Sequence, residues 1–156
     1  DVKVARFAAV HASLAVAGNA GHQSLAVTLR GLALDDVPGE RIPSLLTREL
    51  CSGVLTGAVL GSILAIVVWG LSLVVEGPSP GLGIVMGLAL LVSMSIGTIT
   101  GALVPLLLRR FGADPAQGSC IVLIMITDAV AFGSLLGFTW LALAWILPDA
   151  GAVSVQ

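Results

Sequence analysis

Apolar residues fill four long stretches of this chain, and short polar segments separate the stretches. They cover about residues 7–34, 50–75, 82–108 and 120–147. A helix of roughly 20 apolar residues crosses the hydrocarbon core of a bilayer, so each stretch is long enough for one crossing. None alternates apolar and polar residues as the wall of a membrane β-barrel does. The pattern therefore predicts an all-α membrane protein, a bundle of four transmembrane helices in one transmembrane domain over residues 1–156.

The composition supports a membrane protein. Hydrophobic residues make up 57% of the chain, charged residues 10%, and the mean hydropathy is +1.08. These values lie far outside the range of water-soluble domains. The chain begins at Asp1, without a short basic segment ahead of a signal-type apolar region. We therefore expect an excised domain with sequence upstream of it.

Basic residues are distributed unequally between the two sides of the predicted bundle. Five lie around the first and third connections, and two precede the first span. Because basic residues gather in cytoplasmic connections, we expect the 30–49 and 109–119 connections in the cytoplasm and both termini outside. A cytosolic N-terminal region would then need one more crossing before Asp1, which gives five helices in the full domain. The basic residues of the two connections are Arg30, Arg41, Arg48, Arg109 and Arg110.

Glycines recur at intervals of four residues along the predicted spans. Small residues at this spacing let helix backbones approach closely in lipid, where close packing drives helix association. We therefore expect tight helix contacts at these positions. Cys51 and Cys120 are far apart in sequence and form no Cys-x-x-Cys pair, so we expect them to be small buried hydrophobic residues. The glycine sets are Gly53/Gly57/Gly61, Gly83/Gly87, Gly97/Gly101 and Gly133/Gly137.

Asp128 is the acidic residue that lies well inside a predicted span, in the segment IVLIMITDAVAFG. An ionised carboxylate is costly in a membrane, so such a residue usually faces water or the protein interior and marks an ion pathway. A neutral acid hydrogen-bonded between helices is the alternative. The neighbours on its own helix face are apolar, so an ion-pair partner must come from another helix, another subunit or a bound cation. These neighbours are Ile121, Ile124 and Leu135.

A polar stripe in the first span supplies the other half of a candidate cation site. In AVAGNAGHQSLAV, Asn19, His22 and Gln23 share one face of a helix. Gly18 and Gly21 weaken the helix at that level and leave backbone carbonyls approachable. Oxygen ligands of these kinds suit hard cations such as Mg²⁺, Mn²⁺ and Ca²⁺, although polar packing between helices is the alternative. The predicted metal-binding residues are Asp128, Asn19, Gly18, Gly21, Gln23 and His22.

Other function classes account for fewer of these residues. An intramembrane hydrolase needs a nucleophile with a base or a pair of aspartates, but the chain has one deep acid and no Gly-x-Ser-x-Gly segment. We therefore expect no enzyme. A non-conducting scaffold subunit would explain the glycines but not Asp128, and a proton- or sodium-coupled cation exchanger stays open. The net charge of −2 says little about partners, and for a membrane protein we expect no nucleic-acid partner.

Three segments resemble MgtE-type magnesium transporters in order and spacing. GNAGHQSLAVTLRGLAL is similar to the Gly-Asn-x-Gly-x-Gln signature of their second transmembrane helix, and GALVPLLLRRFGADPA and TDAVAFG to their fourth and fifth helices. The resemblance implies a multi-pass protein of the cell inner (plasma) membrane that begins here at the second helix. It further implies a homodimer in the lipid bilayer, with a pore between the subunits lined by the second and fifth helices.

The resemblance also assigns roles to single residues. Asp128 matches the fifth-helix aspartate, which holds a hydrated Mg²⁺ as the transported ion. The sequence departs from the family pattern at His22, where Asn or Ser is expected, at Ala17, and at the pair Cys120 and Ile121. Because a neutral imidazole is a better ligand for Zn²⁺, Mn²⁺ or Co²⁺ than for Mg²⁺, these three ions stay open as the cation. The cytosolic N-domain and CBS pair of the family have no counterpart in the chain. The residues that match the second-helix signature are Gly18, Asn19, Gly21 and Gln23.

The expected mechanism is conduction of a hydrated divalent cation down its electrochemical gradient. Two Asp128 carboxylates facing each other across a dimer axis repel one another when the site is empty. A dication relieves this repulsion fully and a monovalent cation only half of it, so selectivity for divalent cations follows.

Overall fold

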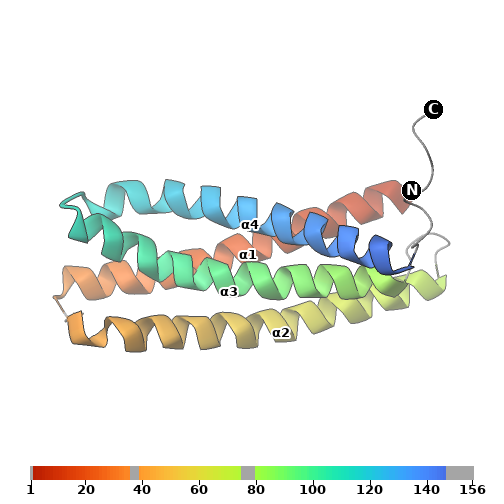
Figure 1. Ribbon diagram of the computed structural model, residues 1–156, viewed down its shortest axis with the longest axis horizontal. Coiled ribbons are helices and arrows are strands. Elements are labelled where there is room, and N and C mark those ends of the chain that lie inside the picture. The colour runs from red at the N-terminus through yellow and green to blue at the C-terminus, as the bar shows by residue number, and fades with distance from the viewer. Residues whose placement is uncertain (1, 36–38, 75–79, 147–156) are drawn as a thin grey trace.

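The computed structural model describes residues 2–35, 39–74 and 80–146, which form an elongated bundle of helices (Figure 1). No strand occurs in these residues, and the predicted all-α membrane fold is confirmed. A 3-10 turn, η1 (Gly39–Arg41), precedes the second helix. The four long helices are α1 (Val2–Ala33), α2 (Ile42–Val74), α3 (Pro80–Arg110) and α4 (Pro115–Ile146).

The helices are long enough to cross a bilayer. In the described residues, three segments are also apolar enough to do so, namely Gly39–Leu71, Gly81–Arg110 and Pro115–Ala142. The first expected span falls on α1, which has 32 residues, but the side chains before Gly18 lie outside the described part of the chain. At about 1.5 Å per residue, each helix exceeds the hydrocarbon thickness, so its ends reach the headgroup region. The protein is therefore a multi-pass membrane protein.

Helix α3 lies at the centre of the bundle and packs against α1, α2 and α4. Most of the buried apolar side chains belong to it, and Met86 and Ala102 are almost fully enclosed. Helices α2 and α4 instead expose large apolar side chains, among them Leu55, Ile66 and Trp140. Such surfaces suit contact with lipid tails, because burial in lipid replaces burial in a protein core.

Close glycine contacts join α2 to α3. A Cβ atom added at Gly61 would lie 2.6 Å from the carbonyl oxygen of Gly87, and one added at Gly57 would lie 2.9 Å from the Cα of Leu91. Gly53 is equally close to α3, where its neighbours are Thr98 and Met94. The glycine spacing thus predicted this seam correctly, since only residues without a Cβ allow the two backbones to approach so closely.

A second close crossing joins α1 to α3, and the last predicted pair has no such contact. Gly101 of α3 lies against the carbonyl oxygen of Gly21, and a Cβ at Gly21 would lie 3.0 Å from the carbonyl oxygen of Gly97. In contrast, a Cβ at Gly133 or Gly137 of α4 would meet nothing within 4 Å in the described residues. The prediction of tight contacts is therefore wrong for Gly133 and Gly137 within one chain.

Capping interactions fix the connection between α3 and α4. Helix α3 ends at Arg110, and Gly112 follows it in a turn with a φ of 74° that favours glycine. The amide of Ala113 donates to the carbonyl of Leu108 at 2.9 Å. The Asp114 carboxylate then accepts a hydrogen bond from the amide of Ala116, which caps the start of α4. This connection and the one between α1 and α2 lie at the same end of the bundle (Figure 1). An ion pair of 2.7 Å between Arg109 and Asp35 joins them.

Candidate functional site

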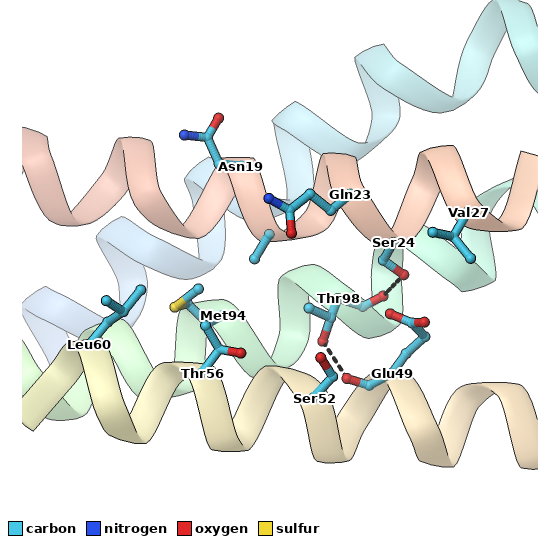
Figure 2. A pocket seen from close by; sticks show the side chains of 11 residues that line it. Asn19, Gln23, Ser24, Val27, Glu49, Ser52, Thr56, Leu60, Met94 and Thr98 are labelled. Atoms are coloured by element: carbon cyan, nitrogen blue, oxygen red, sulfur yellow. Dashed lines mark hydrogen bonds between the residues drawn. The ribbon is translucent and has the colours of Figure 1, made fainter.

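A polar pocket of about 310 Å³ opens between α1 and α2, with α3 behind it (Figure 2). It forms because α1 and α2 each pack against α3 rather than against one another. Polar groups from three helices line a pocket in the membrane-spanning part of the chain, where such groups are costly unless water or a ligand reaches them. The lining residues are Asn19, Ala20, Gln23, Ser24, Val27, Glu49, Ser52, Thr56, Leu60, Met94 and Thr98.

Two hydroxyl groups hold the walls of this pocket together. The Ser24 hydroxyl of α1 donates to the carbonyl oxygen of Thr98 in α3 at 2.7 Å. The Thr98 hydroxyl in turn donates to the backbone carbonyl of Glu49 in α2 at 2.9 Å (Figure 2). Both side chains are buried, and the two bonds fix the three helices relative to one another.

The predicted amide stripe lies at the rim of the pocket. Asn19 and Gln23 are both exposed, and both line it. Figure 2 shows the Gln23 amide turned toward α2 and the Asn19 amide turned away from it. In the described residues, neither side chain hydrogen-bonds to another protein group, so both amides are available to water or a cation. Helix α1 continues without a break through Gly18 and Gly21.

The remaining stripe residues are engaged in helix contacts. The Nδ1–H of His22 donates to the carbonyl oxygen of Gly18 at 2.8 Å, because a carbonyl can only accept. The Nε2 atom then carries the free lone pair of the neutral ring, and the Cys120 thiol of α4 lies 3.4 Å from it as donor. Gly21 is buried in the crossing with α3. The prediction that both cysteines are buried is wrong, since Cys51 and Cys120 are exposed.

Glu49 is a pocket residue that the sequence analysis did not single out. Its half-buried side chain lines the pocket opposite Gln23. In the described residues its carboxylate has no hydrogen-bond or ion-pair partner. A signal was present in the sequence, because Glu49, Ser52 and Thr56 share one face of a helix and form a polar stripe in the apolar α2.

Asp128 lies near the middle of α4 on an exposed part of its surface. The face of α4 that packs into the bundle carries Leu123, Thr127 and Ala131, all buried. Asp128 is about 100° around the helix from Thr127, and in the described residues its carboxylate has no protein partner. It does not line the polar pocket. Asp128 follows Cys120 by eight residues, which is about 12 Å along α4.

No closed metal site exists in the described part of one chain. Among the described residues, three or more His, Cys, Asp or Glu side chains do not come together as they would around a directly ligated ion. The polar pocket offers one carboxylate with amides and hydroxyls, and Asp128 stands apart from it. A cation held by either group would therefore keep most of its water ligands, as Mg²⁺ commonly does.

Known proteins with similar sequences are transporters. Residues 10–138 match the family model MgtE, described as a divalent cation transporter. The chain is 40% identical over 105 residues to a "Magnesium transporter MgtE" of Enterococcus faecalis and 34% identical over 129 residues to one of Bacillus subtilis. It is 31% identical over 115 residues to one of Thermus thermophilus.

The chain is much shorter than these relatives. The matched segments cover 66%, 83% and 74% of this chain, but 22%, 27% and 24% of the three relatives. The chain thus spans about a quarter of the length of the curated relatives it matches. The similarity covers the helical bundle from α1 into α4, and therefore includes both the polar pocket and Asp128.

Proposed function

The chain belongs to the MgtE family of divalent cation transporters, and from this premise we propose that it conducts Mg²⁺ across the membrane through a pore between two copies of the chain. Three relatives carry the name magnesium transporter, which supports Mg²⁺ as the transported ion. The proposal places the whole chain, residues 1–156, in one transmembrane domain of the plasma membrane. It assigns the chain no enzymatic activity.

The observation that carries the proposal is the exposed Asp128 carboxylate in the middle of an apolar helix. A charged side chain at the bilayer centre costs about 2.5–3.5 kcal/mol even on insertion scales. Against lipid this cost would have no compensation, because in the described residues the carboxylate has no protein partner. If Asp128 instead faces the Asp128 of a second copy across a water-filled path, a cation between the two carboxylates would stabilise their charge.

Helices α1 and α4 can form one continuous wall of such a path. They contact each other directly, and the His22 to Cys120 contact of 3.4 Å lies between them. Asn19, Gln23 and Asp128 are exposed side chains on these two helices, and none of the three has a protein partner in the described part of the chain. The wall would therefore offer amide and carboxylate oxygens to the water ligands of a passing cation.

Charge explains why a divalent ion is favoured. Two Asp128 carboxylates across a two-fold axis repel each other, and one dication neutralises both. The membrane potential adds about 4.6 kcal/mol per 100 mV for two elementary charges moving inward. Gly18, Gly21 and His22 contribute to the site by shaping α1. Because the imidazole of His22 is a better ligand for Mn²⁺, Zn²⁺ or Co²⁺ than for Mg²⁺, these are the cations to compare with Mg²⁺.

Uptake of Mg²⁺ into proteoliposomes that hold a membrane potential tests the proposal. We expect Asp128→Asn, which keeps the shape of the side chain but removes its charge, to lower the uptake rate at least tenfold. Asp128→Glu should retain part of the uptake. Asp35→Asn is the matched control, because Asp35 lies in an exposed connection with a φ of 56° that Asn also adopts readily.

Each result decides between function classes. Uptake that is equal in Asp128→Asn and the native chain would rule out Asp128 as the pore site. Uptake that requires an opposing proton or sodium gradient would replace the channel by a coupled exchanger. A native chain without uptake under any gradient would indicate a non-conducting scaffold subunit.

A further inference from the structure

The polar pocket between α1 and α2 contains polar side chains that the proposed Asp128 site does not use. We infer that it binds a second hydrated divalent cation, with Glu49 as the carboxylate that holds this cation. The site lies toward the end of the bundle that carries the basic connections. The inference rests on the proposed function and adds a site that is separate from Asp128. The separation is structural, since α4 contributes no residue to the pocket.

The unpartnered polar groups of the pocket point to a ligand. Ser24 and Thr98 donate their hydroxyl hydrogens to backbone carbonyls and so build the walls. The side chains of Gln23, Glu49, Ser52 and Thr56 have no such partner in the described residues, although all four line the pocket. Polar groups at membrane depth are satisfied by other polar groups, by water or by an ion. A carboxylate with an amide and two hydroxyls is a set that a hydrated hard cation prefers.

The size of the pocket suits a cation that keeps its first shell of water. Six waters occupy about 180 Å³ at their liquid volume of about 30 Å³ each. The pocket is open and has a volume of about 310 Å³, so such an ion fits with further water beside it. Direct coordination without water would need several charged ligands, and the pocket has one. We therefore expect weak binding, which suits a site that an ion must leave again.

The position of the pocket connects the membrane interface to the middle of the bundle. Glu49 is the eighth residue of α2, whose 33 residues exceed the hydrocarbon core by about six or seven residues at each end. Glu49 thus stands at the edge of the core, on the side of the α1–α2 connection. From there the pocket extends to Asn19 and Leu60, near the middle of their helices. Binding at Glu49 would therefore raise the local concentration of the cation at one end of the proposed pathway.

Binding of Mn²⁺, followed through the loss of the electron paramagnetic resonance signal of free Mn²⁺, tests the site directly. We expect Glu49→Gln to lose one class of bound Mn²⁺ that Asp128→Asn retains, and the double variant to lose both. Glu49→Gln should also raise the Mg²⁺ concentration for half-maximal uptake about three- to tenfold, whereas Glu49→Asp should restore binding in part. Glu40→Gln, on the exposed turn η1 outside the pocket, is the matched control and should behave as the native chain.

The outcomes separate the second site from the proposed function. Unchanged Mn²⁺ binding and half-saturation in Glu49→Gln would overturn the Glu49 site, while loss of uptake in Asp128→Asn would still support the pore. Unchanged uptake in Asp128→Asn would instead contradict the pore itself. If Glu49→Gln does not fold, Thr56→Val removes one pocket hydroxyl without changing shape. We then expect weaker Mn²⁺ binding, and native affinity in Thr56→Val would overturn the site.

Discussion

His22 illustrates how one side chain can serve both structure and selectivity. Its Nδ1–H is held by the Gly18 carbonyl, which fixes the ring orientation and leaves Nε2 facing the Cys120 thiol of α4. Nitrogen and sulfur ligands bind Zn²⁺ at about 2.0–2.3 Å, so a small movement of either side chain would let both reach one ion. The pair would then hold a soft cation between α1 and α4, the two helices proposed to line the pore.

This contact predicts the effect of His22→Asn on inhibition by Zn²⁺. We expect Mg²⁺ uptake to stay within about twofold of the native rate, since Asn retains a polar group on α1. The Zn²⁺ concentration that halves Mg²⁺ uptake should rise about tenfold, because one of the two soft ligands is lost. The measurement is Mg²⁺ uptake into proteoliposomes across a Zn²⁺ titration.

A matched pair of cysteine variants checks this explanation. Cys120→Ser should weaken Zn²⁺ inhibition as His22→Asn does. Cys51→Ser should not, because Cys51 is also exposed but contacts no histidine in the described residues. Equal Zn²⁺ inhibition in the native chain, His22→Asn and Cys120→Ser would show that the pair binds no metal.

At the scale of elements, the glycine seam between α2 and α3 determines how closely the helices pack. A methyl group at Gly61 would lie 2.6 Å from the Gly87 carbonyl oxygen, and backbone on both sides prevents a local adjustment. The helices would have to separate, which loses van der Waals contact along the seam. This seam also positions Thr56 and Glu49 of α2 over the pocket, so its integrity bears on the candidate site.

We therefore expect opposite effects from two alanine substitutions on the same helix. Gly61→Ala should destabilise the protein by about 1–3 kcal/mol, as overpacking does in tight cores. Gly70→Ala, where a Cβ meets nothing within 4 Å in the described residues, should be neutral or stabilise α2 by up to about 1 kcal/mol. The apparent midpoint of thermal unfolding in detergent compares the two. A lower midpoint for Gly70→Ala than for Gly61→Ala would contradict the seam.

The sequence predicted the helices better than it predicted which surfaces of the helices contact one another. Four apolar stretches were enough for the helices, and the spacing of Gly53, Gly57 and Gly61 was enough for a close contact. The same spacing at Gly133 and Gly137 does not lie against another helix in the described residues, because glycine spacing alone does not determine which surface packs against a neighbour. Glu49 was missed because its role depends on α1 and α2 lying apart on α3, which no local pattern encodes. The exposed positions of the cysteines were also missed, since a thiol is small and weakly polar and its residue type does not distinguish a buried from an exposed position.

At the scale of the whole molecule, one chain leaves its candidate site incomplete. Asp128 faces outward from the bundle, and no cluster of three metal-binding side chains forms in the described residues. A two-fold axis beside α4 would bring two Asp128 carboxylates together, because a two-fold interface pairs the same surface patch from both copies. The remaining outward surfaces of α2 and α4, rich in large apolar side chains, would then face lipid.

Cross-linking between copies tests this arrangement. In a chain carrying Cys51→Ser and Cys120→Ser, we expect a short bis-maleimide reagent to join two copies through Asp128→Cys. The control is Ala129→Cys, which lies at nearly the same depth and is also exposed, but points about 100° away around α4. Cross-linking at position 128 and not at 129 would place Asp128 beside the axis. The reverse pattern would mean that the copies meet on another face of α4. If the protein sediments as a monomer in detergent, a pore between two chains has no basis.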